Sequence, residues 1–105
     1  MKTLKSLRQS IDQVDEIVAQ LLNERARLAL KIGRVKTEQG IEVHQPEREQ
    51  EVLQRVREVG STGHLGSDGA ERIFQTIIEV SRSLEHQQQQ EGSCGLMESL
   101  SEMWK

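Results

Sequence analysis

One cationic side chain stands where the surrounding pattern demands an apolar residue, and a second lies nearly on the same helix face. Arg25 falls between Leu21 and Leu28, at a position where the alternating three- and four-residue spacing calls for another apolar residue. Lys36 follows eleven residues later, nearly on the same helix face and about 16 Å further along the axis. Buried like charges are unfavourable unless an anion neutralises them. The spacing therefore predicts a site for a small anion in a chain of net charge −3.

The element that carries both cations is a long helix, expected from Thr3 to Gln39. This stretch has no proline, and its heptad-spaced apolar residues are Leu4, Leu7, Ile11, Val14, Val18, Leu21, Leu28, Ile32 and Val35. Thr3 can cap its start, and Gly40 suits the position just past its end. Such a helix is about 55 Å long, whereas a compact domain of about 100 residues has a radius of gyration of about 13 Å. The stripe therefore needs an antiparallel second copy to cover it.

An antiparallel pair of long helices would bring a third cation to the site. Arg8 lies about 25 Å from Arg25 along one helix, too far to share a small ligand within one chain. With a two-fold axis near residue 19, Arg8 comes opposite residue 30 of the other chain, between that chain's Arg25 and Lys36. We therefore predict a homodimer in which Arg8 is contributed across the interface.

A second, short helix is expected from Pro46 to Val59. Proline suits the first turn of a helix, where its missing N–H has no partner to lose. Arg48 and Glu49 lie one turn before the apolar residues that this helix would bury, so both side chains reach the edge of its apolar stripe. This helix can therefore close one side of the anion site.

A third helix of medium length is expected to open at Ser67, after a glycine-rich turn over residues 60–66. Asp68 and Glu71 stand at the spacing of a capping box. The polar residue Ser81 falls on the apolar stripe of this helix, and Glu85 flanks the stripe one turn later. The predicted fold class is all-α, with three helices that are long, short and medium.

The chain divides into a helical domain over residues 1–90 and a C-terminal extension over 91–105. The extension is expected to be a linker followed either by a disordered tail or by a short amphipathic helix with the apolar residues Leu96, Met97, Leu100, Met103 and Trp104.

Composition narrows the function classes. Hydrophobic residues make up 34% of the chain and charged ones 30%, with one Phe, one Trp and no Tyr, so the core must be aliphatic and helical. The acidic balance argues against a nucleic-acid partner. No stretch is apolar enough for a signal peptide or a membrane span. Cys94 is the single cysteine and cannot form an internal disulfide, which favours a cytoplasmic location.

Taken with their spacing, these residues resemble a known family, the all-α chorismate mutases. The matching residues of the first helix are Leu7, Arg8, Ile11, Asp12, Asp15, Leu21, Leu22, Glu24, Arg25, Ala29, Ile32, Gly33 and Lys36. The later matches are Pro46-Glu47-Arg48-Glu49 and Phe74, Gln75, Ile77, Ile78, Glu79 and Ser81. The resemblance implies an intertwined antiparallel homodimer with two sites, each borrowing one arginine. It also implies the Claisen rearrangement of chorismate to prephenate, on the route to phenylalanine and tyrosine.

The resemblance assigns roles in substrate binding. Arg25, with Arg8 of the partner subunit, would bind the two carboxylates of chorismate. Arg48 would line the site, and Ser81 would contact a carboxylate or lie beside it.

The resemblance also assigns roles in catalysis. Lys36 would donate to the ether oxygen of the breaking bond, residue 85 would supply a second donor there, and Glu49 would take the ring hydroxyl. A pericyclic reaction requires no nucleophile, metal or cofactor, and the sequence offers no convincing set for any. Catalysis would come from holding the reactive conformer and stabilising charge on the ether oxygen.

Two positions depart from the family pattern. Gln45 stands where many relatives have Asp, and glutamine is a poorer helix N-cap; a substrate-hydroxyl contact would be made through Gln45 instead. Glu85 stands where many relatives have Gln and some have Glu. A carboxyl group donates only when protonated, so we expect turnover to fall as pH rises and Glu85→Gln to flatten that profile.

Two other functions remain open at this point. An isochorismate pyruvate lyase shares the fold and the cationic pocket, but typically lacks an acid after the arginine at position 48, so Glu49 favours the mutase. A non-catalytic helical dimerisation module would use Arg25 only to fix the register of the pair.

Overall fold

The computed structural model describes the backbone of residues 3–103 and the side chains of residues 3–89. It contains three helices: α1 over Leu4–Gln39, α2 over Pro46–Ser61 and α3 over Ser67–Met103. No strand occurs in the described part of the chain. The all-α prediction and the order of the three helices are confirmed. The third helix is not of medium length, because its 37 residues match the 36 of α1.

The extra length of α3 lies at its C-terminal end. Its backbone stays helical through residues 91–95, where the sequence predicted a linker. The side chains of Cys94 and of the apolar residues expected to form the short amphipathic helix lie outside the described residues. The division of the chain at residue 90 therefore stays a prediction.

Both ends of α1 are fixed by local chemistry. The Ser6 backbone N–H donates to Thr3 Oγ1 and the Thr3 N–H donates to Ser6 Oγ, each over 3.1 Å, which completes a capping box. Gly40 ends the helix with φ 68° and ψ 31°, the left-handed conformation that glycine adopts without strain. The predicted caps at Thr3 and Gly40 are confirmed.

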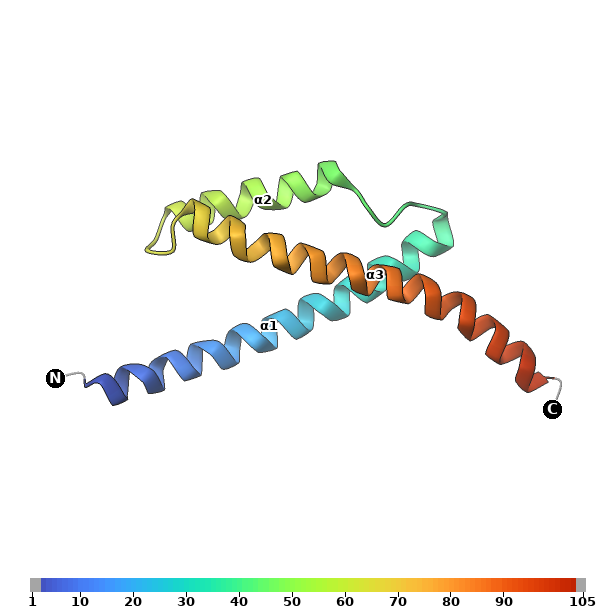
Figure 1. Ribbon diagram of the computed structural model, residues 1–105, viewed down its shortest axis with the longest axis horizontal. Coiled ribbons are helices and arrows are strands. Elements are labelled where there is room, and N and C mark those ends of the chain that lie inside the picture. Colours follow the sequence, from blue (N-terminus) through green and yellow to red (C-terminus); the bar gives the residue numbers. More distant parts are fainter. Residues whose placement is uncertain (1–2, 104–105) are drawn as a thin grey trace.

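The helix α3 lies at the centre of the arrangement (Figure 1). It packs against both α1 and α2, whereas the backbones of α1 and α2 do not contact each other within the described helices. In Figure 1, α1 and α3 cross, α2 runs beside the first half of α3, and the first half of α1 projects past the rest. The chain is 69 × 33 × 14 Å with a radius of gyration of 18.9 Å, well above the roughly 13 Å of a compact domain of this size.

The crossing of α1 and α3 depends on Gly33. A Cβ atom at this position would lie 2.8 Å from the Glu85 Cα atom and 3.0 Å from the Glu85 carbonyl oxygen. Any side chain would therefore push the two backbones apart. Because Lys36 is one turn after Gly33 on α1, this close approach brings Lys36 to Glu85.

The α2–α3 connection is tightened by two glycines. Helix α2 runs to Ser61, two residues beyond its predicted end at Val59. Gly66 has φ 82° and donates from its N–H to the Gly60 carbonyl over 3.0 Å. A Cβ on Gly60 would lie 2.5 Å from the Gly66 carbonyl oxygen, so the turn closes only because this position has no side chain.

A latch of charged side chains also joins α2 to α3. Arg57 Nη1 donates to Asp68 over 3.1 Å and to Glu71 over 2.6 Å. These hydrogen bonds, with Asp68 first and then Glu71, raise the pKa of Arg57. The two acids predicted to form a capping box therefore bind Arg57, from another helix.

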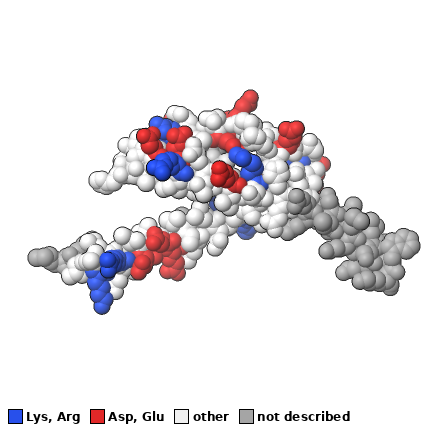
Figure 2. Space-filling view, viewed as in Figure 1, with Lys and Arg blue, Asp and Glu red and all other residues white. Residues whose placement is uncertain are grey.

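The predicted heptad stripe of α1 is uncovered in the single chain. Eleven large apolar side chains of this helix are 40–64% exposed, whereas Ala29 and Gly33, on the face that meets α3, are buried. Figure 2 shows positive and negative side chains close together over α2, whereas on the projecting half of α1 the positive side chains lie nearest the N-terminal end and the negative ones follow. Among the described residues, no helix is both long and apolar enough to cross a membrane.

Candidate active site

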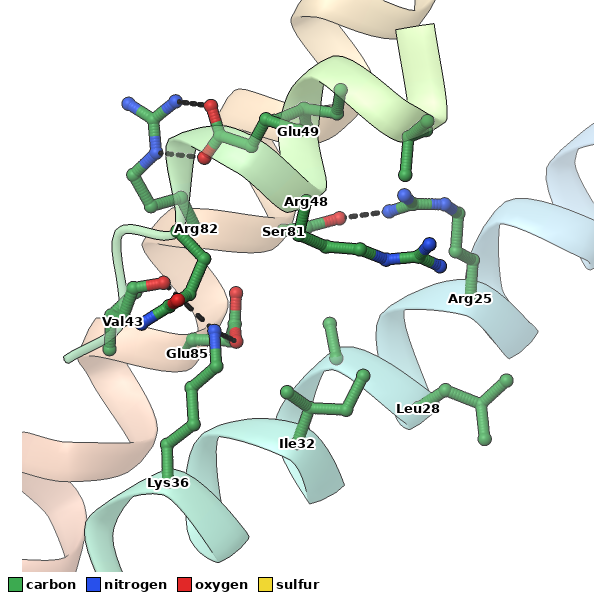
Figure 3. Close-up of a pocket in the computed structure, with 14 residues that line it drawn as sticks. Arg25, Leu28, Ile32, Lys36, Val43, Arg48, Glu49, Ser81, Arg82 and Glu85 are labelled. Atoms are coloured by element: carbon green, nitrogen blue, oxygen red, sulfur yellow. Dashed lines mark hydrogen bonds and ion pairs between the residues drawn. The ribbon is translucent and has the colours of Figure 1, made fainter. Parts of the chain in front are cut away.

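A cavity of about 410 Å³ opens between α1 and α2, with α3 as its floor (Figure 3). This volume is within the usual range for small-molecule sites. Seven of the eight predicted site residues line it: Arg25, Lys36, Gln45, Arg48, Glu49, Ser81 and Glu85.

The charge of the cavity is positive although the chain is acidic. Four cationic side chains line it, and two carboxylates oppose them, those of Glu49 and Glu85. Positive charge therefore exceeds negative charge by two, which suits a small dianion. Apolar side chains such as Leu28, Ile32 and Ile78 form much of the remaining wall.

Arg25 is held from α3. Its Nη1 donates to the Ser81 hydroxyl oxygen, and that hydroxyl donates in turn to the Ile77 carbonyl over 2.9 Å. Ser81 thus bonds back to its own helix and still accepts from Arg25. This explains a polar residue on the α3 stripe, because it fixes the guanidinium at the cavity wall.

Lys36 lies between α3 and the loop before α2. Its Nζ donates to the Val43 carbonyl over 2.8 Å and lies 2.8 Å from Glu85 Oε1. The lysine side chain is 16% exposed and that of Glu85 11%. The approach to Oε1 is an ion pair without hydrogen-bond geometry, so this buried oxygen has a charge partner but no hydrogen bond.

Glu49 is bound by Arg82, a residue that the sequence did not single out. Arg82 Nε donates to Oε2 over 3.1 Å and Nη2 donates to Oε1 over 2.7 Å, as drawn in Figure 3. Nothing local could have identified this pair, because its members are 33 residues apart on different helices. The contact between Lys36 and the Val43 carbonyl could not be predicted either. Every residue has a backbone carbonyl, so this acceptor cannot be recognised from the residue type.

Gln45 and Arg48 line the more open part of the cavity. Gln45 is the N-cap residue of α2 but makes no capping hydrogen bond, in keeping with the poor capping ability expected of glutamine. Its amide donates instead to the Glu42 carbonyl over 2.9 Å. Arg48 is 58% exposed and donates to Glu51 over 3.1 Å, so its guanidinium is not fixed by the cavity wall.

Arg8 is the one predicted site residue that the single chain keeps away from the cavity. It is exposed, lies on the projecting half of α1 and lines none of the cavities described.

Among the residues with described side chains, no group of three or more His, Cys, Asp or Glu residues is placed to hold a metal ion.

Fold and cavity together define the class: an all-helical protein with a ligand-sized, positively charged cavity assembled from three helices. The sequence profile of the family described as "Chorismate mutase type II" matches residues 7–86. The chain belongs to this family.

Individual relatives agree with this assignment. The chain is 30% identical over 87 residues to a chorismate mutase of Methanocaldococcus jannaschii, covering 83% of this chain and 88% of that protein. It is 38% identical over 88 residues to a bifunctional chorismate mutase/prephenate dehydratase of Aquifex aeolicus, and 37% identical over 78 residues to one of Escherichia coli. These matches cover 81% and 74% of this chain. The chain spans only 24% and 20% of the length of these two bifunctional relatives.

Proposed function

We propose that this chain is an isomerase that rearranges chorismate to prephenate, in the biosynthesis of phenylalanine and tyrosine. The observation that carries the proposal is the cavity in which seven predicted site residues converge, and whose lining, with Arg82 included, has an excess of two positive charges. Chorismate carries two carboxylates, so its charge matches that excess. Membership of the chorismate mutase family supports the same reaction.

Binding would depend on the arginines. Arg25 is already oriented by Ser81, so little side-chain freedom is lost when it meets a substrate carboxylate. Arg48, which is exposed, would turn from Glu51 towards the ligand. Arg8 of the partner subunit would complete the set of cations. Together these groups would hold chorismate in the compact conformer from which the new carbon–carbon bond forms.

The barrier would be lowered at the ether oxygen, where negative charge grows as the carbon–oxygen bond breaks. Lys36 is the proposed donor, held by the Val43 carbonyl on the cavity wall. A donor fixed before the reaction needs no reorganisation in the transition state, and the loss of one such donor typically costs about 10²–10³-fold in kcat.

Glu85 would be the second donor to the ether oxygen. It faces Lys36 as an ion pair. A carboxyl group donates only when protonated, whereas the amide of a glutamine donates at any pH, so Glu85→Gln is expected to flatten the pH–rate profile. This feature would distinguish the chain from relatives with glutamine at the same position.

The ring hydroxyl would be accepted by Glu49. Both oxygens of its carboxylate are fixed by Arg82, and Gln45 also lines the cavity. These contacts would orient the ring without taking part in bond breaking.

We further propose that the active form is an antiparallel homodimer. The eleven exposed apolar side chains of α1 support this, because a stripe of this length needs a cover in water. The dimer would also bring Arg8 of the partner subunit to a cavity that it does not reach within one chain. The cytoplasmic location remains a proposal based on the single cysteine.

Loss of chorismate absorbance, followed with purified protein, tests the proposed reaction. We expect turnover with prephenate as product, and a loss of about 10²-fold or more in Arg25→Ala. Arg27→Ala is the matched control, because Arg27 is exposed on the same helix and pairs only with Glu24 among the described residues. Release of pyruvate from isochorismate instead would identify a lyase. No turnover of either compound would contradict both enzymatic functions and favour the non-catalytic dimerisation module.

A further inference from the structure

The contact between Arg82 and Glu49 points to a residue of the site beyond those assigned so far. We propose that Arg82 is a positioning residue, which fixes the Glu49 carboxylate so that it can accept the ring hydroxyl of the substrate. This inference rests on the function proposed above and adds one residue to its machinery.

The geometry of the contact is that of a two-pronged clamp. Two nitrogens of one guanidinium donate to the two oxygens of one carboxylate, over 3.1 and 2.7 Å. Such a planar fork fixes the plane of the carboxylate as well as its position, which a lysine cannot do. The side chains are 34% and 22% exposed, so water only partly competes with the clamp.

Glu49 has no equivalent support from another described residue. Its other neighbour is the imidazole of His44, whose Nε2 lies 3.8 Å from Oε1 and whose side chain is 55% exposed. Glu49 is also in the first turn of α2, and the backbone of α2 contacts that of α3 but not that of α1. Arg82, on α3, therefore ties Glu49 to the helix that forms the cavity floor.

The clamp leaves the carboxylate able to bind substrate. An ionised carboxylate offers about four acceptor directions, and the fork uses one on each oxygen. The remaining directions can accept the ring hydroxyl. The positive charge of Arg82 also offsets the negative charge of Glu49. Without this compensation, the Glu49 carboxylate would repel a dianion entering the cavity.

A double-mutant cycle tests whether Arg82 acts through Glu49. We expect Arg82→Ala to lower kcat/KM for chorismate by about 10- to 100-fold, since a mispositioned contact costs up to about 100-fold. In a Glu49→Ala background the same substitution should change kcat/KM by less than about threefold, because coupled residues are not additive. Equal losses in both backgrounds would overturn the proposal, since Arg82 would then act independently of Glu49.

A conservative variant tests whether activity depends on the bidentate geometry of Arg82 or on its charge alone, and thermal unfolding controls for effects on stability. Arg82→Lys keeps the charge without the fork and should remain at least about fivefold below wild type; full activity would show that charge alone matters. Thermal unfolding of each variant fixes an assay temperature at which all are folded. Arg72→Ala, which replaces an exposed arginine on the same helix, should have the kcat/KM of wild type.

Inactive wild-type protein would refute the proposed function itself. That result differs from equal losses in both backgrounds of an active enzyme, which would refute only the role of Arg82.

Discussion

The substitution Gly33→Ala puts the crossing of α1 and α3 to a direct test. The new Cβ would lie 2.8 Å from the Glu85 Cα atom, whereas ordinary contacts begin at 3.4 Å, so the helices must separate by about 0.6 Å. Alanine gains about 1 kcal/mol over glycine in a helix interior, and overpacking against a fixed neighbour costs about 1–3 kcal/mol. We therefore expect a net loss of up to about 2 kcal/mol in the free energy of unfolding.

The same separation should damage the site, because the clash is with the backbone of Glu85 itself and its ion-pair partner Lys36 lies one turn after Gly33. A misplacement of 1 Å can cost about 100-fold, so we expect kcat to fall by about tenfold. Urea unfolding followed by circular dichroism gives the stability, and chorismate consumption gives the rate.

Gly69→Ala is the matched control for this experiment. Gly69 is also helical, but a Cβ there would meet only Leu65, with Cδ1 at 3.4 Å and Cγ at 3.6 Å, which are acceptable contacts. We expect this variant to be as stable as wild type or more stable, by up to about 1 kcal/mol. If Gly33→Ala has the same free energy of unfolding and the same kcat as Gly69→Ala, the result would contradict a close contact between α1 and α3 at Gly33.

Other substitutions probe the dimer stripe, the acid at position 85 and the latch between α2 and α3. Val18→Asp places a charge on the exposed stripe near the expected two-fold axis and should yield monomers in sedimentation velocity, whereas Gln20→Asp, on the opposite face, should stay dimeric; two dimeric variants would argue against this interface. Glu85→Gln should give a pH–rate profile flatter than that of wild type, because an amide donates at any pH, and an unchanged slope would exclude Glu85 as the second donor to the ether oxygen. Arg57→Ala should lower the urea midpoint while kcat/KM at low temperature stays within about threefold, because the latch is remote from the cavity; an unchanged midpoint would show that this partly exposed ion pair contributes little.

The existence of the three helices and both ends of α1 were predictable because they follow from local rules. The caps at Thr3 and Gly40 depend on residues within a few positions, and heptad spacing identifies α1 without tertiary information. The C-terminal part of α3 was not predicted. Gly92 and Gly95 each disfavour a helix by about 1 kcal/mol, which suggested a break, but the backbone remains helical there.

The cavity was predictable where helix faces alone decide which side chains converge. Arg25 and Ser81 fall on apolar stripes and Lys36 lies nearly on the same helix face as Arg25, so packing of these faces brings the three together. The clamp from Arg82 to Glu49 was not predictable, since it depends on how α2 lies along α3.

The importance of Gly33 was likewise hidden from the sequence. Position 33 must have no side chain only because the backbone of another helix passes within contact distance, and this packing is not visible in the sequence. The position of Arg8 in a shared site is still a prediction.

Complementation between two inactive variants tests the shared site most directly. Arg8→Ala and Arg25→Ala homodimers should each be inactive, because every site lacks one arginine. A mixed dimer has one site with both arginines intact and one with neither. Since half of the dimers in an equal, fully exchanged mixture are mixed, we expect activity to return to about a quarter of wild type. A mixture no more active than its components, or an Arg8→Ala variant that is fully active by itself, would contradict a site built from two chains.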